Sequence, residues 1–298
     1  MTRHLLEIDD LTADELHRTL DLAEDPQPAQ VLAGRGMALV FQKPSARTRN
    51  SMEMAVVQLG GHPVSVRGDE VGIDTRESAE DVVRTLACYH AAVGARVFDH
   101  RVLERMSAVS PVPVVNLLSD EAHPLQALAD LLTLRQEWGG FEGRVLAYVG
   151  DGNNVCRSLG LAGALAGLEV RAACPPGYDV PPLHADRLKA LGAEVVTTAR
   201  ADEAAAGADA VYTDVWASMG QEDESGDRRR AFEGFGVDER LMAAAAPGAL
   251  FLHCLPAHRG EEVAAAVVDG PASRVWTQAA NRMHAARGLL QLLLGSTA

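Results

Sequence analysis

Two patterns of hydrophobic and polar positions alternate along the 298 residues of the chain. Short apolar runs are followed by longer stretches in which apolar residues recur at helical spacing. The runs expected to form buried strands are residues 36–42, 62–66, 91–98, 112–116, 144–149, 168–174, 193–198, 208–213 and 248–254. Strands alternating with helices predict an α/β protein with parallel sheets and crossover helices.

Capping signals place several of the helices. Thr12 and Glu15 form a capping box that opens the first long helix. A helix is expected within residues 45–61, where Gly60-Gly61 ends it, and another over residues 124–138. A last amphipathic helix is expected near the C-terminus, with Arg282 at its start.

Two segments interrupt the alternation. Residues 139–143, "GGFEG", are the candidate hinge between two doubly wound domains, and the length fits two domains of about 150 residues. Residues 217–236 are long, charged and without apolar period, which predicts a loop or functional lid.

Composition narrows the class of function. Hydrophobic residues make up 47% of the chain, and the formal net charge of −14 argues against nucleic acid or an anionic membrane as partner. No apolar run approaches the length of a membrane span, and the N-terminus does not resemble a signal peptide. Four widely spaced cysteines fit reduced thiols in the cytoplasm.

Unusual residues follow the ends of the predicted strands. They are "KPSARTR" at 43–49, Arg96, "SDEAHPLQ" at 119–126, "GDGNN" at 150–154, "DVWASMG" at 214–220 and "HCLPAHRG" at 253–260. Open α/β sheets bind ligands at the carboxyl ends of their strands. Both halves are therefore expected to offer loops to one shared cleft.

The segment "KPSARTR" predicts an anion site. Ser45 is a good N-cap that can accept from the amide of Arg47 or Thr48, and the helix dipole favours an anion there. Cations placed against the dipole are unfavourable by ~0.3–1 kcal/mol each unless an anion offsets them. Arg47 is expected to face the ligand, whereas Arg49 and Lys43 are expected to have structural roles.

The other motifs allow more than one interpretation. "GDGNN" opens a helix after a strand, but a dinucleotide fingerprint needs glycine where Val155 stands. Its asparagines could hold a polar ligand or cap the helix. His253, Cys254 and His258 lack a fourth ligand at any zinc-site spacing, and neighbouring strand-end side chains alternate in direction, which disfavours a Cys–His nucleophile.

His123 and Gln126 lie three residues apart at a helix start, on one face, where they could grip a carbonyl and an NH₂ group. Taken alone, a histidine near a helix start is more ordinarily a cap or surface residue. The ordinary interpretation of Arg282 is a solvated cation on a docking helix.

The order of these motifs resembles the aspartate/ornithine carbamoyltransferase family, and the ornithine branch in particular. The motifs that carry the resemblance are "FQKPSARTR", "HPLQALAD", "GDGNN", "DVWASMGQE", "HCLPAHRG" and "ANRMH". The resemblance implies transfer of a carbamoyl group from carbamoyl phosphate to L-ornithine. It implies a carbamoyl phosphate-binding domain over residues 1–138 with a returning helix over 281–298, an ornithine-binding domain over 143–278, and an active site in the cleft between them.

The resemblance also assigns roles to individual residues. Carbamoyl phosphate would be bound by Ser45, Ala46, Arg47, Thr48, Arg96, His123, Gln126 and Arg282. Ornithine would be bound by Asn154, Asp214, Ser218, Met219, Cys254 and Leu255. The residues expected to act in catalysis are Arg96, His123, Cys254 and Arg282, with Cys254 as a neighbour of the amine and not a nucleophile. The resemblance implies no cofactor or metal. It implies a cytoplasmic protein that assembles as a homotrimer or a multiple of it.

Three positions depart from the family pattern. Gln42 stands where glutamate is common, Ala46 where threonine often occurs, and Ala280 where glutamate is expected. Gln42 and Ala280 thereby remove carboxylates that could orient arginines. The segment 68–78 is a variant of the loop that reaches a neighbouring subunit in this family.

Competing interpretations remain. One is a carbamoyltransferase for another amine, such as putrescine or an N-acylated ornithine. A second is a catalytically weak paralogue with a regulatory role. A third is a Rossmann-type dehydrogenase, which fails at Val155.

Overall fold

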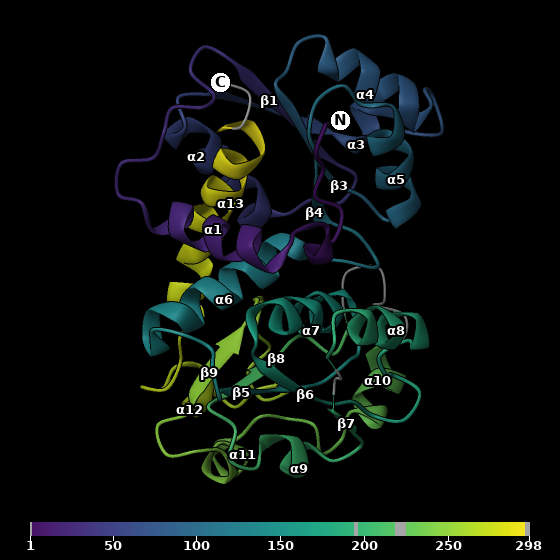
Figure 1. Cartoon of the computed structure of the whole chain (residues 1–298). Coiled ribbons are helices and arrows are strands. Elements are labelled where there is room, and N and C mark those ends of the chain that lie inside the picture. Colours follow the sequence, from purple (N-terminus) through teal and green to yellow (C-terminus); the bar gives the residue numbers. More distant parts are fainter. Residues whose placement is uncertain (1, 194–195, 218–224, 296–298) are drawn as a thin grey trace. The chain divides into compact units, whose positions relative to one another are not determined.

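The computed structural model describes residues 2–193, 196–217 and 225–295. The chain forms two compact units, one of Met1–Leu132 with Ala280–Ala298 and the other of Thr133–Ala279 (Figure 1). Among the described residues, no helix combines the length and the apolar character needed to cross a membrane.

The first unit contains a parallel four-stranded sheet in the order β2-β1-β3-β4. Its strands are β1 (Gly36–Phe41), β2 (His62–Arg67), β3 (Ala92–Arg96) and β4 (Val114–Leu118). Its short and long helices are η1 (Ile8–Asp10), α1 (Ala13–Glu24), α2 (Ala46–Gln58), α3 (Gly68–Val71), α4 (Ala79–Ala87) and α5 (His100–Val109). In Figure 1, α1 and α2 lie on one side of the sheet and α4 and α5 on the other. Covered on both faces, β1 and β3 are almost continuously buried, as parallel strands usually are.

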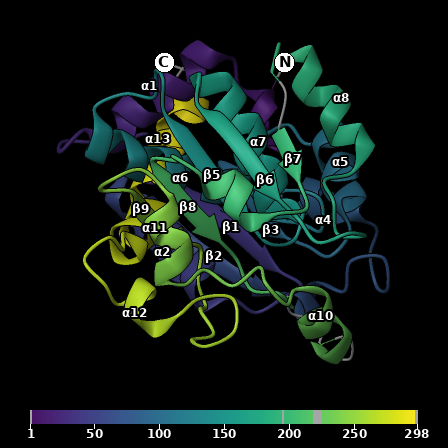
Figure 2. The ribbon, with the colours of Figure 1, turned by 90° about the horizontal axis from the view of Figure 1, so that it is seen from below.

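The second unit contains a parallel five-stranded sheet in the order β7-β6-β5-β8-β9. Its strands are β5 (Val145–Val149), β6 (Glu169–Ala173), β7 (Val196–Thr198), β8 (Ala210–Thr213) and β9 (Leu250–His253). Its helices are α7 (Asn154–Ala166), α8 (Pro182–Ala190), α9 (Ala201–Ala205), α10 (Ser225–Ala231), α11 (Glu239–Ala244) and α12 (Ala265–Val268). Figure 2 shows β5, β6 and β7 side by side. The doubly wound fold predicted from the alternating pattern is confirmed in both units.

Two longer helices, α6 (Pro124–Trp138) and α13 (Val275–Gly295), contribute residues to both units. The C-terminal part of α13 packs on α1, as predicted. A Cβ atom on Gly288 would lie 2.3 Å from the carbonyl oxygen of Thr19, so this close approach requires glycine. Arg287 donates to the carbonyl oxygens of Ala23 at 2.6 Å and Asp25 at 2.8 Å. Because α13 begins at Val275, Arg282 lies inside the helix, and its predicted position at the helix start is wrong.

The irregular loop expected over residues 217–236 contains a helix in its second part, so the prediction of a loop is wrong there, while a role as a functional lid stays a prediction. Residues 225–231 form α10, and Phe232 and Phe235 are buried in the core of the second unit. Arg228 is also buried, and it forms an ion pair with Asp151 and lies over the ring of Tyr178. This helix is held by contacts with residues far away in the sequence, and the spacing of apolar residues along the chain cannot predict such contacts. Residues 218–224 of the predicted lid lie outside the described residues.

Candidate functional site

Several of the predicted site residues follow strands that flank the point in each sheet where the strand order reverses. In the first unit this point lies between β1 and β3, which are followed by α2 and by the segment after Arg96. In the second unit it lies between β5 and β8, which are followed by residues 150–153 and by Asp214. Ligands of open α/β sheets bind at such switch points.

The N-terminus of α2 has the predicted cap. Ser45 has extended backbone angles, and its hydroxyl accepts from the backbone amide of Thr48 at 3.2 Å. Arg47 occupies the first turn and is exposed, whereas Thr48 is buried. The capped end therefore presents amides together with an accessible cation, the arrangement that binds anions.

Two buried arginines converge on the hydroxyl of Thr48. Arg96 donates from Nη1 to Thr48 Oγ1 at 3.1 Å, and Arg282 donates from Nη2 to the same oxygen at 2.9 Å. Both side chains are over nine-tenths buried. Two guanidinium groups on one neutral oxygen repel each other, so this cluster is suited to a bound anion.

Gln126 has a fixed orientation beside this cluster. Its Nε2 donates to Asp130 Oδ1 at 2.7 Å, and Arg282 Nη1 donates to its Oε1. A guanidinium can only donate and a carboxylate can only accept, so these partners determine which way the amide points. The Gln126 oxygen is thereby turned toward the arginine cluster, where it can accept from an NH₂ group.

His123 is buried next to the same cations. Burial holds the pKa of His123 well below its ordinary value, and the charges of Arg282, Arg96 and Arg47 lower it further. The imidazole is therefore neutral near pH 7. A neutral ring can donate a hydrogen bond to a developing oxyanion without adding another cation to the cluster.

Arg49 and Lys43 have structural partners, as predicted. Arg49 forms an ion pair with Glu53 at 2.8 Å, and the Lys43 ammonium lies 4.2 Å from the ring centroid of Phe98. Gln42 accepts from the backbone amide of Phe98 at 3.1 Å. Glutamine supplies this acceptor oxygen as well as glutamate does, so the departure at position 42 leaves the backbone contact intact.

Asn153 and Asp214 connect the two strands at the switch point of the second unit. Asn153 caps α7, accepting from the amides of Val155 at 2.9 Å and Cys156 at 3.1 Å. Its Nδ2 donates to Asp214 Oδ2 at 2.9 Å. Of the two asparagines left open between capping and ligand binding, Asn153 is the cap and Asn154 is the first residue of α7.

Cys254 follows β9 and lies against Asp214. Its Sγ donates to Asp214 Oδ1 at 2.8 Å, and the amide of Val215 donates to the same oxygen at 2.8 Å. A carboxylate on the thiol hydrogen favours the protonated thiol, which is the poor nucleophile. This contact agrees with the interpretation of Cys254 as a neighbour of the reacting group.

Two clusters of candidate metal ligands occur within the part of the chain that the structure describes: Asp214, His253 and Cys254, and His258, Glu261 and Glu262. In the first cluster His253 Nδ1 accepts from the amide of Leu255, and Nε2 lies 3.2 Å from Glu262 Oε1. Both imidazole nitrogens are thus engaged in hydrogen bonds, which argues against a metal ligand role for His253.

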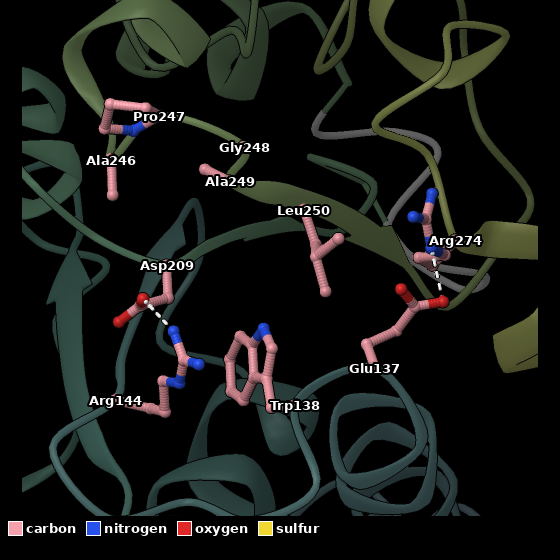
Figure 3. Close-up of a pocket in the computed structure, with 10 residues that line it drawn as sticks. All are labelled: Glu137, Trp138, Arg144, Asp209, Ala246, Pro247, Gly248, Ala249, Leu250 and Arg274. Atoms are coloured by element: carbon pink, nitrogen blue, oxygen red, sulfur yellow. Dashed lines mark hydrogen bonds and ion pairs between the residues drawn. The ribbon is translucent and has the colours of Figure 1, made fainter.

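A separate pocket of about 260 Å³ lies beside the amino-terminal ends of β5, β8 and β9 in the second unit (Figure 3). It is lined by Glu137, Trp138, Arg144, Asp209, Ala246, Pro247, Gly248, Ala249, Leu250 and Arg274. Its charges pair with each other: Arg144 with Asp209 at 2.7 Å and Arg274 with Glu137 at 2.6 Å. The lining includes residues just before β5, β8 and β9, away from the strand ends that carry the predicted site residues.

The structure adds residues that the sequence did not single out. Asp130 and Glu262 each fix the orientation of a predicted site residue or its neighbour. Gln126 and Asp130 are four residues apart on a predicted helix, about one turn, so their contact could have been predicted from the sequence. Ser218 and Met219 were predicted to bind ornithine, and both lie outside the described residues.

The two sheets define a two-domain α/β protein with a cluster of polar side chains beside the switch point of each sheet. More particularly, the chain belongs to the aspartate/ornithine carbamoyltransferase family. Residues 3–136 match the family's carbamoyl-P binding domain, and residues 142–293 match its Asp/Orn binding domain.

Relatives cover nearly the whole chain. An ornithine carbamoyltransferase of Acidothermus cellulolyticus is 51% identical over 99% of this chain and 97% of its own, and one of Parafrankia sp. is 49% identical with the same coverage. A solved ornithine carbamoyltransferase of Pyrococcus furiosus has a TM-score of 0.94 at 41% identity, covering 99% of this chain and 98% of that one. The corresponding structure from Thermus thermophilus has a TM-score of 0.90 at 45% identity, with 99% of both chains covered.

Proposed function

We propose that this protein transfers the carbamoyl group of carbamoyl phosphate to the δ-amine of L-ornithine, giving L-citrulline and phosphate. The observation that carries the proposal is the convergence of Arg96 and Arg282 on Thr48 beside neutral His123. It is supported by relatives named ornithine carbamoyltransferase that match over the length of the chain.

The proposed roles in the first unit follow from its donors. Ser45, the Ala46 amide, Arg47 and Thr48 bind the phosphate group. Arg96, His123 and Thr48 bind the carbamoyl oxygen, Gln126 accepts from the carbamoyl NH₂ through its fixed oxygen, and Arg282 contacts the same ligand. Because Arg96, Arg282 and Gln126 are held by buried partners before the ligand arrives, these groups need little reorganisation on binding.

Carbamoyl phosphate is already an activated acyl donor, so no covalent enzyme intermediate is needed. The neutral δ-amine attacks the carbonyl carbon, a C–N bond forms and a tetrahedral oxyanion develops. The C–O bond to phosphate then breaks, and the amine proton leaves with phosphate or solvent. Arg96 and His123 stabilise the oxyanion, and one such donor is typically worth ~10²–10³-fold in rate.

The proposed ornithine site lies in the second unit. Asn154, Asp214, Ser218 and Met219 hold the α-amino acid end, while Cys254 and the Leu255 carbonyl lie near the δ-amine. Asp214 supplies the negative charge that an α-ammonium group requires, and its hydrogen bonds from Asn153 and Cys254 fix the carboxylate in place.

The larger assignments belong to the same proposal. Residues 1–138 with 281–298 form the carbamoyl phosphate-binding domain, and residues 143–278 form the ornithine-binding domain. The protein acts in the cytoplasm as a homotrimer or a multiple of it. Met54 and Val57 on α2 are 46% and 48% exposed, which fits a subunit contact on that helix.

The test is a panel of amines. The protein is incubated with carbamoyl phosphate and, separately, L-ornithine, putrescine, N-acetylornithine or aspartate, and the ureido product is assayed. The proposal expects product with ornithine. Product only with putrescine or the acylated amine would contradict it, and no product with any amine would favour a non-catalytic paralogue.

A further inference from the structure

The segment after β9 holds an unusual backbone conformation. Leu255 has φ = 61°, in the left-handed region that non-glycine residues rarely adopt. Such a conformation is strained and persists only when neighbouring contacts hold it. Leu255 also carries the carbonyl that the proposed function places near the δ-amine, so whatever holds this residue also positions that carbonyl.

Hydrogen bonds from two directions hold the segment. The backbone amide of Leu255 donates to His253 Nδ1 at 2.9 Å. The backbone amide of His258 donates to Glu262 Oε1 at 2.5 Å. Glu262 Oε1 also lies 3.2 Å from His253 Nε2. One carboxylate oxygen therefore connects His253, where the segment begins, with His258, where it ends.

The direction of these bonds fixes the tautomer of His253. A backbone amide can only donate, so Nδ1 must carry no hydrogen and accept. The ring hydrogen is then on Nε2, where it points at the Glu262 carboxylate. In the opposite tautomer Nδ1–H would face the Leu255 amide, two donors with no acceptor between them.

Burial makes this arrangement costly to disturb. Glu262 has no exposed surface and His253 is 1% exposed. A buried imidazole N–H left without an acceptor is destabilising, so the acceptor that Glu262 Oε1 offers to His253 matters for this segment. The neighbouring Glu261 is different, because it forms an ion pair with the exposed Arg229.

We infer that Glu262 is a positioning residue for the reaction. It holds His253 as the Nε2–H tautomer, and His253 in turn holds the Leu255 amide, so that the Leu255 carbonyl and the Cys254 thiol are presented to the amine. The inference rests on the proposed function for its effect on rate, and on the hydrogen bonds of the second unit for its geometry.

The kinetic test compares Glu262→Ala, Glu262→Gln and the matched control Glu261→Gln. Glu262→Ala removes the acceptor, and we expect kcat/KM for ornithine to fall about 10- to 100-fold, the effect of an error of about 1 Å in substrate position. The dissociation constant for carbamoyl phosphate should change less than about threefold. Glu262→Gln retains an acceptor oxygen and should recover most of the activity, and Glu261→Gln should behave like the unmodified protein.

A spectroscopic test separates this inference from the proposed function. Nitrogen-15 NMR of the imidazoles, with His253 assigned by a His253→Gln variant, reports which ring nitrogen carries the hydrogen. We expect Nε2–H in the unmodified protein and a mixture of tautomers in Glu262→Ala. Nδ1–H in the unmodified protein, or an unchanged tautomer in the variant, would overturn the inference even if no amine is carbamoylated.

Two kinetic outcomes would overturn it as well: equal losses of kcat/KM for both substrates in Glu262→Ala, or no recovery in a folded Glu262→Gln. Circular dichroism shows whether each variant is folded at the assay temperature. If Glu262→Ala does not fold, Glu262→Gln and the tautomer of the unmodified protein still decide the question.

Discussion

Replacing Arg282 by methionine should weaken the binding of carbamoyl phosphate much more than it lowers the stability of the free protein. Arg96 Nη1 and Arg282 Nη2 both bind Thr48 Oγ1, so these nitrogens can be at most 6.0 Å apart, the sum of the distances 3.1 Å and 2.9 Å. Two like charges at that separation repel by about 3 kcal/mol at an effective dielectric constant of 20. A carbamoyl phosphate anion in the same place gains a similar attraction from each guanidinium.

Arg282→Met should therefore weaken carbamoyl phosphate binding by about 3 kcal/mol, or roughly 150-fold in Kd. The free protein loses the hydrogen bonds to Thr48 and Gln126 but also loses the repulsion from Arg96. Its free energy of unfolding should change by no more than about 1–2 kcal/mol. Isothermal titration calorimetry measures the affinity, and urea denaturation measures the stability.

Arg287→Met is the matched control on the same helix. Arg287 donates to the carbonyl oxygens of Ala23 and Asp25 and to Gln58. Its loss should destabilise the protein by about 3 kcal/mol and leave the affinity of the folded protein unchanged. The reasoning is refuted if Arg282→Met destabilises as much as Arg287→Met, or if it leaves Kd within about threefold of the original.

Three further predictions concern the same clusters. The pKa of His123 is depressed in the folded protein, so below pH 6.5 the unfolded chain binds more protons and the free energy of unfolding should fall as the pH drops. His123→Gln should reduce this fall, which urea denaturation at several pH values measures. An unchanged dependence on pH would contradict the low pKa. Cys254→Ser retains a hydroxyl that can donate to Asp214, so kcat should fall without reaching zero. Rapid-quench turnover assays measure this, and complete loss of activity would instead support a nucleophilic thiol. Thr48→Val removes the oxygen shared by two arginines and should lower the free energy of unfolding by about 2–4 kcal/mol. Because Thr48 is also a proposed ligand contact, carbamoyl phosphate should raise the Tm of this variant less than that of the unmodified protein, and an equal rise would contradict that contact.

The strands were predictable because buried parallel strands are short continuous apolar runs. All nine runs expected from the sequence overlap one of the strands β1 to β9. The caps at Thr12 and Ser45 were predictable for a local reason, since each bonds to an amide three residues ahead.

Contacts between distant residues could not be predicted in this way. The helix α10 contains mainly polar residues, and its buried Arg228 depends on Asp151, 77 residues away in sequence. The pairing of Asp214 with Cys254, and of His253 with Glu262, requires knowing how the loops after β8 and β9 fold back. The family resemblance supplied the residue roles, while the orientation of Gln126 and of His253 came only from their hydrogen bonds.

The central claim is tested most directly by measuring phosphate and ureido product together. Carbamoyl phosphate and L-ornithine are mixed with the protein, and the two products are quantified over time. Carbamoyl transfer predicts L-citrulline and phosphate in equal amounts, with formation of both dependent on ornithine. Protein-dependent release of phosphate without L-citrulline would contradict the proposal.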